Sequence, residues 1–320
     1  MEWQQQDTMY YLVPGVDGEE PKESIAAFDI DWTLSYSQHH MFGAEPHDIE
    51  ILPLRLDRIR ELYDMGVYTI ALFTNQSAEK KDVIQKRLDR MANLVRKLGV
   101  PCYVFVATGS DKKGVPDPYR KPQRGMWDKL LEFVPRPKKA FFVGDAMGRP
   151  QDFSDCDLEF ARACEIEPKT PEQYFGVTGV PFVQSPSGKD LVVFVGMPGC
   201  GKSSLYKHLF EPLGMRSVSQ DVLKNRKRLL SKLEGLLEDG QSVVVDNTNP
   251  SHEKNRKEYY DLAEKYGFNV TVIYFVRDGR GWNKLRSEEK CVPTIAYTGY
   301  FSRLDPPTEE NTPGTLLLVT

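Results

Sequence analysis

The sequence has few cysteines and no long apolar run, and each absence excludes a class of protein. Its five cysteines are an odd number and no two of them have CxxC spacing, so neither a disulfide framework nor a structural zinc site is predicted. No segment reaches the roughly 18 apolar residues that a membrane-spanning helix needs. The N-terminus lacks the basic and apolar regions of a signal peptide. We therefore expect an intracellular protein in a reducing compartment, with no membrane partner.

The sequence also lacks an excess of positive charge. Its 42 lysines and arginines face 46 aspartates and glutamates, which gives a net charge of −4. This excludes a nucleic-acid coat protein that is basic all over, but not a local groove lined with lysine and arginine. With 40% apolar and 28% charged residues the composition is that of a globular protein, and 320 residues exceed the usual size of one domain.

Short apolar runs rich in β-branched and aromatic residues alternate with longer amphipathic segments. The first half contains SIAAFDI, VYTIALF, CYVFVA and AFFVGD, and the second contains LVVFVG, RSVS, SVVVD and NVTVIYFV. Helical spacing is clearest over residues 78–98 and 222–237. The alternation predicts an α/β protein of two tandem doubly wound parallel-sheet domains, residues 1–175 and 190–320. A linker at 176–189 joins them, where Gly, Pro and Ser interrupt both periodicities.

Polar side chains follow the predicted strands of the first half. Asp29 and Asp31 follow the first apolar run, and Thr74, Lys121 and Asp145 come later. Because the carboxyl ends of parallel strands meet at one edge, these groups should gather there: Asp29, Asp31 and Asp145 around Mg²⁺, Thr74 and Lys121 around phosphate oxygens. Asp29 could then attack phosphorus and form an aspartyl-phosphate. Asp31 could protonate the leaving oxygen and later deprotonate a water.

A glycine-rich motif opens the second half. Residues 191–204, LVVFVGMPGCGKSS, run from a predicted strand into G-x-x-x-x-G-K-S and then a helical pattern. In that context backbone N–H groups wrap the phosphates of ATP, Lys202 reaches the β and γ oxygens, and Ser203 binds Mg²⁺. The predicted ATP-binding residues are Gly196, Gly199, Cys200, Gly201, Lys202, Ser203 and Ser204.

Later strand ends offer groups for a phosphoryl acceptor. Asp221 follows RSVSQ and could accept the proton of an attacking hydroxyl, although an N-cap aspartate would look the same in sequence. Asp246 stands in VVVDNTNP at the position of a Walker-B carboxylate. Arg277, Arg280 and Arg286 are candidates for a lid that clamps ATP, and one or two of them could instead be surface residues.

These motifs resemble a known family. DIDWTL, FTNQ, RKPQRGMWD and FVGDAMGR look like the four motifs of the haloacid-dehalogenase (HAD) phosphatases, and their spelling is similar to the polynucleotide kinase 3′-phosphatase family. GMPGCGKSS, DNTNP and GYFSRLDPPTEE look like the P-loop kinase domain of the same family. The order, phosphatase before kinase, is that of the eukaryotic enzymes. The resemblance begins at about residue 24, which leaves no room for a forkhead-associated domain.

The resemblance implies removal of a 3′-phosphate and ATP-dependent phosphorylation of a 5′-hydroxyl, with Mg²⁺ and ATP. It gives Asp29, Asp31, Thr74, Lys121, Asp145 and Asp221 the roles described above, makes Asp157 structural, and favours Arg286 as the lid residue. The implied partners are DNA ends, with RNA as an alternative, and a repair ligase or scaffold. A monomer is expected, in the nucleus or else the cytoplasm, without a clear targeting signal.

Two other interpretations stay open at this point. A small-metabolite phosphatase could be fused to an unrelated kinase, because both folds host many substrates. A non-catalytic scaffold could bind DNA ends, although intact Asp29, Asp31, Lys202 and Ser203 argue against it.

Some positions allow both a functional and a plain interpretation. Trp32 stands where the family has glycine, and it could stack on the terminal nucleoside or pack under a loop. Residues 45–50 are expected to shape a cap over the first site. Basic residues that could grip DNA or form solvated faces are Lys112, Lys113, Arg120, Arg124 and Arg149, and then Lys224, Arg226, Lys227 and Arg228.

Overall fold

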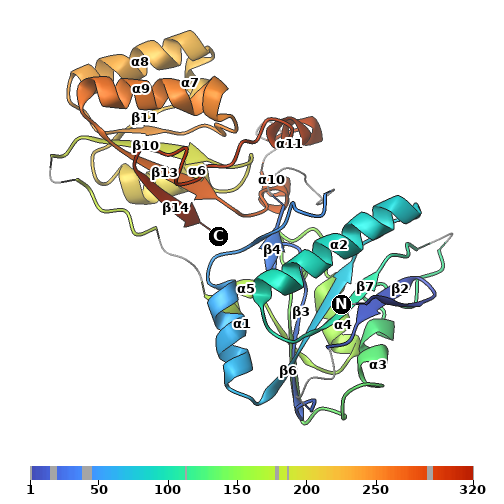
Figure 1. Ribbon diagram of the computed structural model, residues 1–320. Coiled ribbons are helices and arrows are strands. Elements are labelled where there is room, and N and C mark those ends of the chain that lie inside the picture. Colours follow the sequence, from blue (N-terminus) through green and yellow to red (C-terminus); the bar gives the residue numbers. More distant parts are fainter. Residues whose placement is uncertain are drawn as a thin grey trace. The chain divides into compact units, whose positions relative to one another are not determined.

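The computed structural model describes residues 2–14, 20–37, 45–111, 114–176, 180–185, 187–286 and 291–319. The chain forms two compact units, Met1–Val177 and Thr178–Thr320, each with its own sheet (Figure 1). The division falls within the segment 176–189 that the composition marks as a linker. None of the described helices is long and apolar enough to cross a bilayer.

The first unit is built on a seven-stranded sheet of order β1-β2-β7-β6-β3-β8-β9. Its strands are β1 Gln4–Gln6, β2 Met9–Leu12, β3 Ser24–Phe28, β6 Tyr68–Asn75, β7 Tyr103–Ala107, β8 Lys139–Val143 and β9 Glu167–Lys169. The five central and later strands are parallel, as predicted. The sheet also carries an antiparallel hairpin of β1 and β2 on the β7 edge, which the apolar runs did not predict. A tight two-residue turn can join only antiparallel strands.

Both faces of this sheet are covered. Along β3, Ala26 and Phe28 point to one face, and Ile25 and Ala27 point to the other, as the two-residue period of a strand requires. The first face packs against α1 Arg55–Asp64, α2 Lys81–Leu98 and α5 Pro171–Phe175, and the second against α3 Gly125–Leu130 and α4 Cys156–Ala163 (Figure 1). A separate antiparallel pair, β4 Ser35–Tyr36 and β5 Glu50–Ile51, follows the DIDWTL motif.

The second unit has a five-stranded, wholly parallel sheet of order β11-β12-β10-β13-β14. The strands are β10 Asp190–Val195, β11 Arg216–Val218, β12 Val243–Val245, β13 Asn269–Phe275 and β14 Thr315–Val319. The edge strand β14 was not among the predicted strands. Its helices are α6 Lys202–Leu205, π-helix η1 Tyr206–Phe210, α7 Gln220–Leu223, α8 Arg226–Glu238, π-helix η2 His252–Arg256, α9 Lys257–Tyr266, α10 Arg280–Lys284 and α11 Thr294–Phe301.

The helix predicted over 222–237 is divided in two. Lys224 ends α7 in a left-handed conformation with φ 61°. The Asn225 side chain then caps α8, because its Oδ1 accepts a hydrogen bond from the backbone N–H of Lys227 at 2.7 Å. The predicted helix over 78–98 is confirmed, but it begins at Lys81.

Candidate active sites

The sheet of the first unit brings the predicted groups to one edge. β3 lies between β6 and β8, and Phe28 is paired with Leu72 on one side and Val143 on the other. The chain therefore leaves all three strands at the same edge, where Asp29, Thr74 and Asp145 follow or end them.

Lys121 is the buried centre of this site. Its side chain reaches the edge with Nζ 2.6 Å from Asp29 Oδ1 and 2.6 Å from Asp157 Oδ1. Asn75 fixes the Lys121 backbone by two hydrogen bonds, Nδ2 to the carbonyl oxygen at 3.0 Å and the amide N–H to Oδ1 at 2.9 Å. Burial lowers the pKa of Lys121, but the carboxylates of Asp157 and Asp29 outweigh it, so the net pKa lies above that of an ordinary lysine. The ammonium is thus kept charged.

Three carboxylates at this edge form a candidate cation site. Asp29, Asp145 and Asp157 each offer an oxygen, and these oxygens lie within 4.8 Å of one another. Burial raises the pKa of Asp29 to about 7; Lys121 opposes this rise and the charge of Asp157 adds to it. One ammonium does not balance three carboxylates, and hard oxygen ligands are those that Mg²⁺ prefers, so the residues fit a divalent cation.

Two residues that the sequence assigned to this site have contacts that the sequence did not indicate. Asp157, expected to be structural, is buried with 1% of its surface exposed and contributes to the carboxylate cluster. It also braces the neighbouring loop, because its Oδ2 accepts a hydrogen bond from the amide of Ala146 at 3.1 Å. Asp31, expected to be a metal ligand, does not join the cluster. Its Oδ1 pairs with Arg90 Nη2 at 2.9 Å, and its Oδ2 accepts from Gln76 Nε2 at 2.5 Å.

Trp32 occupies a turn that favours glycine. Its φ is 64°, in the left-handed region where a Cβ costs about 1–2 kcal/mol. Its amide donates to the carbonyl oxygen of Ser35 at 2.7 Å, which closes the turn. This backbone requirement would favour glycine at that position. The side chain is partly exposed.

We expect Trp32→Gly to weaken binding of an oligonucleotide at this site without lowering stability. Loss of one stacked base costs about 1–3 kcal/mol, so KM for a 3′-phosphorylated oligonucleotide should rise roughly 10-fold. Relief of backbone strain offsets the greater chain entropy of glycine, so Tm should change little. KM for p-nitrophenyl phosphate, which has no nucleoside, is the control. Equal KM values for wild type and variant on the oligonucleotide would show that the ring only packs.

The basic residues proposed to grip DNA in this unit are partly neutralised. Arg124 pairs with Asp128 at 2.9 Å, and Arg149 pairs with Asp152 at 2.9 Å. Arg120 donates to Ser77 Oγ at 2.6 Å, next to the FTNQ motif. Lys112 and Lys113 lie outside the described residues. Of the arginines, Arg120 is therefore the better candidate for a phosphate contact.

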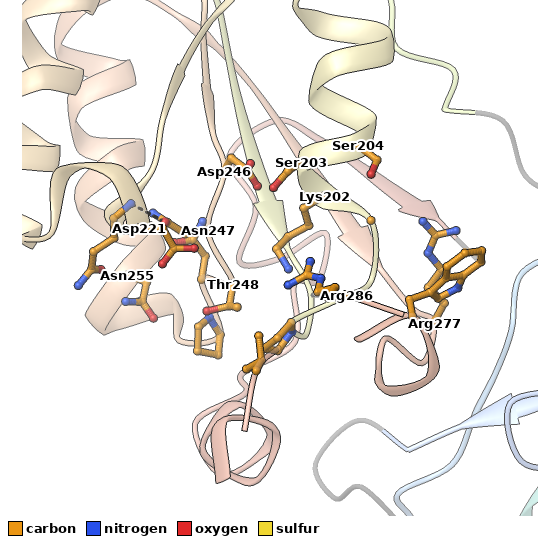
Figure 2. A pocket seen from close by; sticks show the side chains of 18 of the residues that line it. Lys202, Ser203, Ser204, Asp221, Asp246, Asn247, Thr248, Asn255, Arg277 and Arg286 are labelled. Carbon is orange, nitrogen blue, oxygen red and sulfur yellow. Dashed lines mark hydrogen bonds between the residues drawn. The ribbon is translucent and has the colours of Figure 1, made fainter. Parts of the chain in front are cut away.

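The glycine-rich motif of the second unit borders a cavity of about 850 Å³ (Figure 2). Gly199, Gly201, Lys202, Ser203 and Ser204 line it. A Cβ on Gly199, whose φ is 82°, would lie 2.3 Å from the carbonyl oxygen of Gly279, so only glycine fits there. Gly196 and Cys200 are not among the lining residues; a Cβ on Gly196 would meet Cys200 Sγ at 2.8 Å. These two shape the loop from behind.

Polar groups inside the cavity are arranged for phosphate and its counter-ion. Lys202 Nζ donates to the backbone carbonyls of Gly196 at 2.8 Å and Met197 at 2.7 Å. Burial raises the pKa of Asp246, and a hydrogen bond with the Ser203 hydroxyl opposes that rise. A serine hydroxyl beside a carboxylate fits the Mg²⁺ that accompanies a nucleoside triphosphate.

Asp221 lines the same cavity and is not the helix cap. Ser219 caps α7, because its Oγ accepts from the amide of Asp221 at 3.2 Å. Asn247 Oδ1 accepts from the amide of Gln220 at 2.8 Å, which ties the start of α7 to the loop after β12. In Figure 2, Asp221 and Arg277 lie on opposite sides of Lys202. The Asp221 carboxylate thus lines the cavity that the glycine-rich loop also borders, and the alternative role as an N-cap fails.

The three arginines predicted as candidates for a lid are placed differently. Arg277 and Arg286 line the cavity, and Arg277 Nε donates to the carbonyl oxygen of Cys200 at 2.6 Å. Arg280 Nε donates to Asp278 at 2.8 Å, and Arg280 does not line the cavity. Among the other basic candidates Lys224 is a lining residue, while Arg226 pairs with Glu258. Lining residues that sequence reasoning did not single out include Asn247, Thr248, Asn255, Trp282 and Arg303.

Comparison with known proteins gives a family for each unit. Residues 24–175 match the family described as Polynucleotide kinase 3 phosphatase, and residues 191–288 match an AAA domain. The chain is 29% identical to the Bifunctional polynucleotide phosphatase/kinase of Schizosaccharomyces pombe, over 97% of this chain and 82% of that protein. It is 32% identical to the Polynucleotide 3′-phosphatase ZDP of Arabidopsis thaliana, over 54% of this chain and 27% of that protein. Among solved structures, a D,D-heptose 1.7-bisphosphate phosphatase from B. bronchiseptica is 21% identical with a TM-score of 0.39, over 48% of this chain and 83% of that one.

Proposed function

The chain belongs to the polynucleotide kinase 3′-phosphatase family, and from that premise we propose that it heals broken nucleic-acid ends. It removes a 3′-phosphate and transfers the γ-phosphate of ATP to a 5′-hydroxyl. The observation that carries this proposal is that one chain holds both sites: a buried lysine between aspartates in one unit, and a cavity lined by both a glycine-rich loop and a carboxylate in the other.

The phosphatase reaction proceeds in two displacements. Asp29 attacks phosphorus, the bond from phosphorus to the 3′ oxygen breaks, and Asp31 gives its proton to that oxygen. Lys121 neutralises charge on the phosphoryl oxygens. Water then attacks the aspartyl-phosphate, Asp31 takes its proton, and inorganic phosphate leaves.

The kinase reaction uses the cavity of the second unit. The backbone of the glycine-rich loop and Lys202 hold the phosphates of ATP. When ATP binds, Lys202 gives up its hydrogen bonds to the carbonyls of Gly196 and Met197 and contacts the phosphates instead. Asp221 accepts the proton of the 5′-hydroxyl as its oxygen attacks the γ-phosphorus, and ADP leaves. Bound Mg²⁺, held by Asp29, Asp145 and Asp157 in one unit and by Ser203 and Asp246 in the other, would neutralise phosphoryl oxygens.

The products of the two reactions indicate the partner proteins, the substrate and the compartment. A 3′-hydroxyl beside a 5′-phosphate is what a ligase joins, so a repair ligase or scaffold protein is the expected partner. We propose DNA as the principal substrate, with RNA as the alternative, a monomeric enzyme and residence in the nucleus, where DNA breaks arise.

The direct test uses an oligonucleotide with a 3′-phosphate and a 5′-hydroxyl, with Mg²⁺ and labelled ATP. We expect phosphate release from one end and label on the other, and DNA and RNA versions rank the substrates. Sugar phosphates and free sugars run in parallel. Faster turnover of these small molecules than of oligonucleotides would favour the metabolite fusion, and no turnover of any of them would favour the scaffold.

We expect Asp221→Asn to impair only the kinase. Loss of a general base costs about 10²–10⁴-fold in rate. ATP binding should be unchanged, because asparagine keeps the shape of the side chain. Removal of the 3′-phosphate should also be unchanged, because Asp221 belongs to the other unit. Single-turnover transfer of labelled phosphate measures the rate. Asp239→Asn, an exposed change at the end of α8, is the matched control. A variant that transfers phosphate at the wild-type rate would exclude Asp221 as the base.

A further inference from the structure

Arg90 is a fully buried arginine that contacts the acid/base carboxylate of the phosphatase. It lies on α2 with 1% of its surface exposed. Its Nη2 is 2.9 Å from Asp31 Oδ1, and its Nε donates to the backbone carbonyl of Asp48 at 3.1 Å. Its Nη1 is buried and has no acceptor among the described residues. Burial of a charge is costly, and pairing with a carboxylate offsets this cost only in part when one donor stays unpaired. The position of Arg90 therefore needs an explanation.

The two oxygens of Asp31 are held by donors of different kinds. Oδ1 is held by the permanently charged guanidinium of Arg90, and Oδ2 by the neutral amide of Gln76 at 2.5 Å. Gln76 is itself oriented, because Arg87 Nη1 donates to its Oε1 at 3.3 Å and its Nε2 also donates to Thr74 Oγ1 at 2.9 Å. A charged, rigid donor holds its oxygen more strongly than an amide does. Oδ2 is therefore the oxygen that a substrate can take over.

We propose that Arg90 is a positioning residue, which anchors Oδ1 of Asp31 so that Oδ2 faces the leaving oxygen. The inference rests on the proposed phosphatase function. When substrate binds, its 3′ oxygen replaces the Gln76 amide at Oδ2, the bond from phosphorus to that oxygen breaks, and the proton on Oδ2 moves to it. Asp29 holds the phosphoryl group meanwhile. In the second displacement the attacking water returns a proton to Oδ2.

A purely structural role for Arg90 is the competing explanation. Helix α2 is also tied to segment 45–50 by contacts that do not involve Asp31. Lys97 Nζ donates to the carbonyl of Ile49 at 2.7 Å and pairs with Glu50 at 2.8 Å, and Asn93 Nδ2 donates to the carbonyl of Pro46 at 2.8 Å. Like Arg90, Lys97 contacts a backbone carbonyl of segment 45–50, but it does not contact Asp31. Lys97→Met is therefore the matched control.

The test compares two leaving groups in the first turnover of Arg90→Gln. A 3′-phosphorylated oligonucleotide releases an alkoxide that needs a proton, whereas p-nitrophenyl phosphate releases a phenolate that does not. We expect release of the 3′-hydroxyl to slow by about 10²-fold, the low end for general acid catalysis, and release of nitrophenolate to change by less than about 5-fold. Arg90→Lys, which keeps the charge, should recover part of the oligonucleotide rate. Lys97→Met should leave both rates near wild type.

Several outcomes would overturn the inference. Equal slowing on both substrates, or a similar change of ratio in Lys97→Met, would assign Arg90 to the fold. In the Asp31→Asn background, Arg90→Gln should cause little further loss, and a full additional loss would show that it does not act through Asp31. Release of nitrophenolate at the same site reports on the integrity of the first unit, and if Arg90→Gln is insoluble the ratio is measured on Arg90→Lys. Wild-type protein inactive on both substrates would instead refute the phosphatase function itself.

Discussion

Replacement of Asp29 by asparagine is expected to abolish phosphatase activity while the kinase continues at its wild-type rate. Asparagine keeps the shape of the side chain but removes the nucleophilic oxygen, and loss of a catalytic nucleophile costs about 10⁴-fold or more in kcat. Stability should not fall, because burial disfavours the charge of Asp29, as its raised pKa shows, and Lys121 keeps its pairing with Asp157. Phosphate release from a 3′-phosphorylated oligonucleotide and label transfer to a 5′-hydroxyl measure the two activities.

The matched control for Asp29→Asn is Asp57→Asn on α1, an exposed aspartate of the same unit. Both activities of that variant should equal those of wild type. Residual phosphatase turnover above about 1% of wild type would be too fast for a site without its nucleophile. The aspartyl-phosphate would then have to form elsewhere.

Replacement of Lys202 by methionine is expected to give the reciprocal result. Methionine keeps most of the apolar stem, but the ammonium that reaches the phosphates is gone. Loss of one such charge from a preorganised site costs about 10²–10³-fold in rate. Lys202 is 8% exposed, so the methionine side chain adds little apolar surface in contact with water. Labelled phosphate transfer should fall accordingly, and 3′-phosphate release should stay at the wild-type rate.

The matched control is Lys207→Met, an exposed lysine in η1. A kinase that keeps more than about a tenth of its rate in Lys202→Met would show that the loop does not bind ATP in the expected way. A parallel fall of phosphatase activity would show that the two units depend on one another for their chemistry.

The parts of both sites that sequence could predict are those fixed by local pattern. A strand followed by G-x-x-x-x-G-K-S places Lys202 and Ser203 without further information, and parallel strands bring Asp29 and Asp145 to one edge because sheet topology demands it. The backbone strain at Trp32 is also local, since the turn needs a positive φ.

What sequence could not predict depends on contacts between distant segments. The pairing of Arg90 with Asp31 requires knowing how α2 lies over the DIDWTL turn, and an arginine in an amphipathic helix usually indicates a solvated face. The same limit applies to Asp157, whose oxygen reaches Lys121 only in the folded chain. Ion pairs such as Arg149 with Asp152 are equally invisible in sequence, so a count of basic residues overstates the charge available to DNA.

Every residue of the carboxylate cluster belongs to Met1–Val177, and every residue lining the large cavity belongs to Thr178–Thr320. Among the described residues, the carboxylate cluster and the cavity lining have no side chain in common. A strand break with two unfinished termini can therefore be repaired in either sequence of events. Loss of the first site would leave 3′-phosphate ends, and loss of the second would leave 5′-hydroxyl ends. Cells that lack one activity should therefore be distinguishable by which of these two ends accumulates.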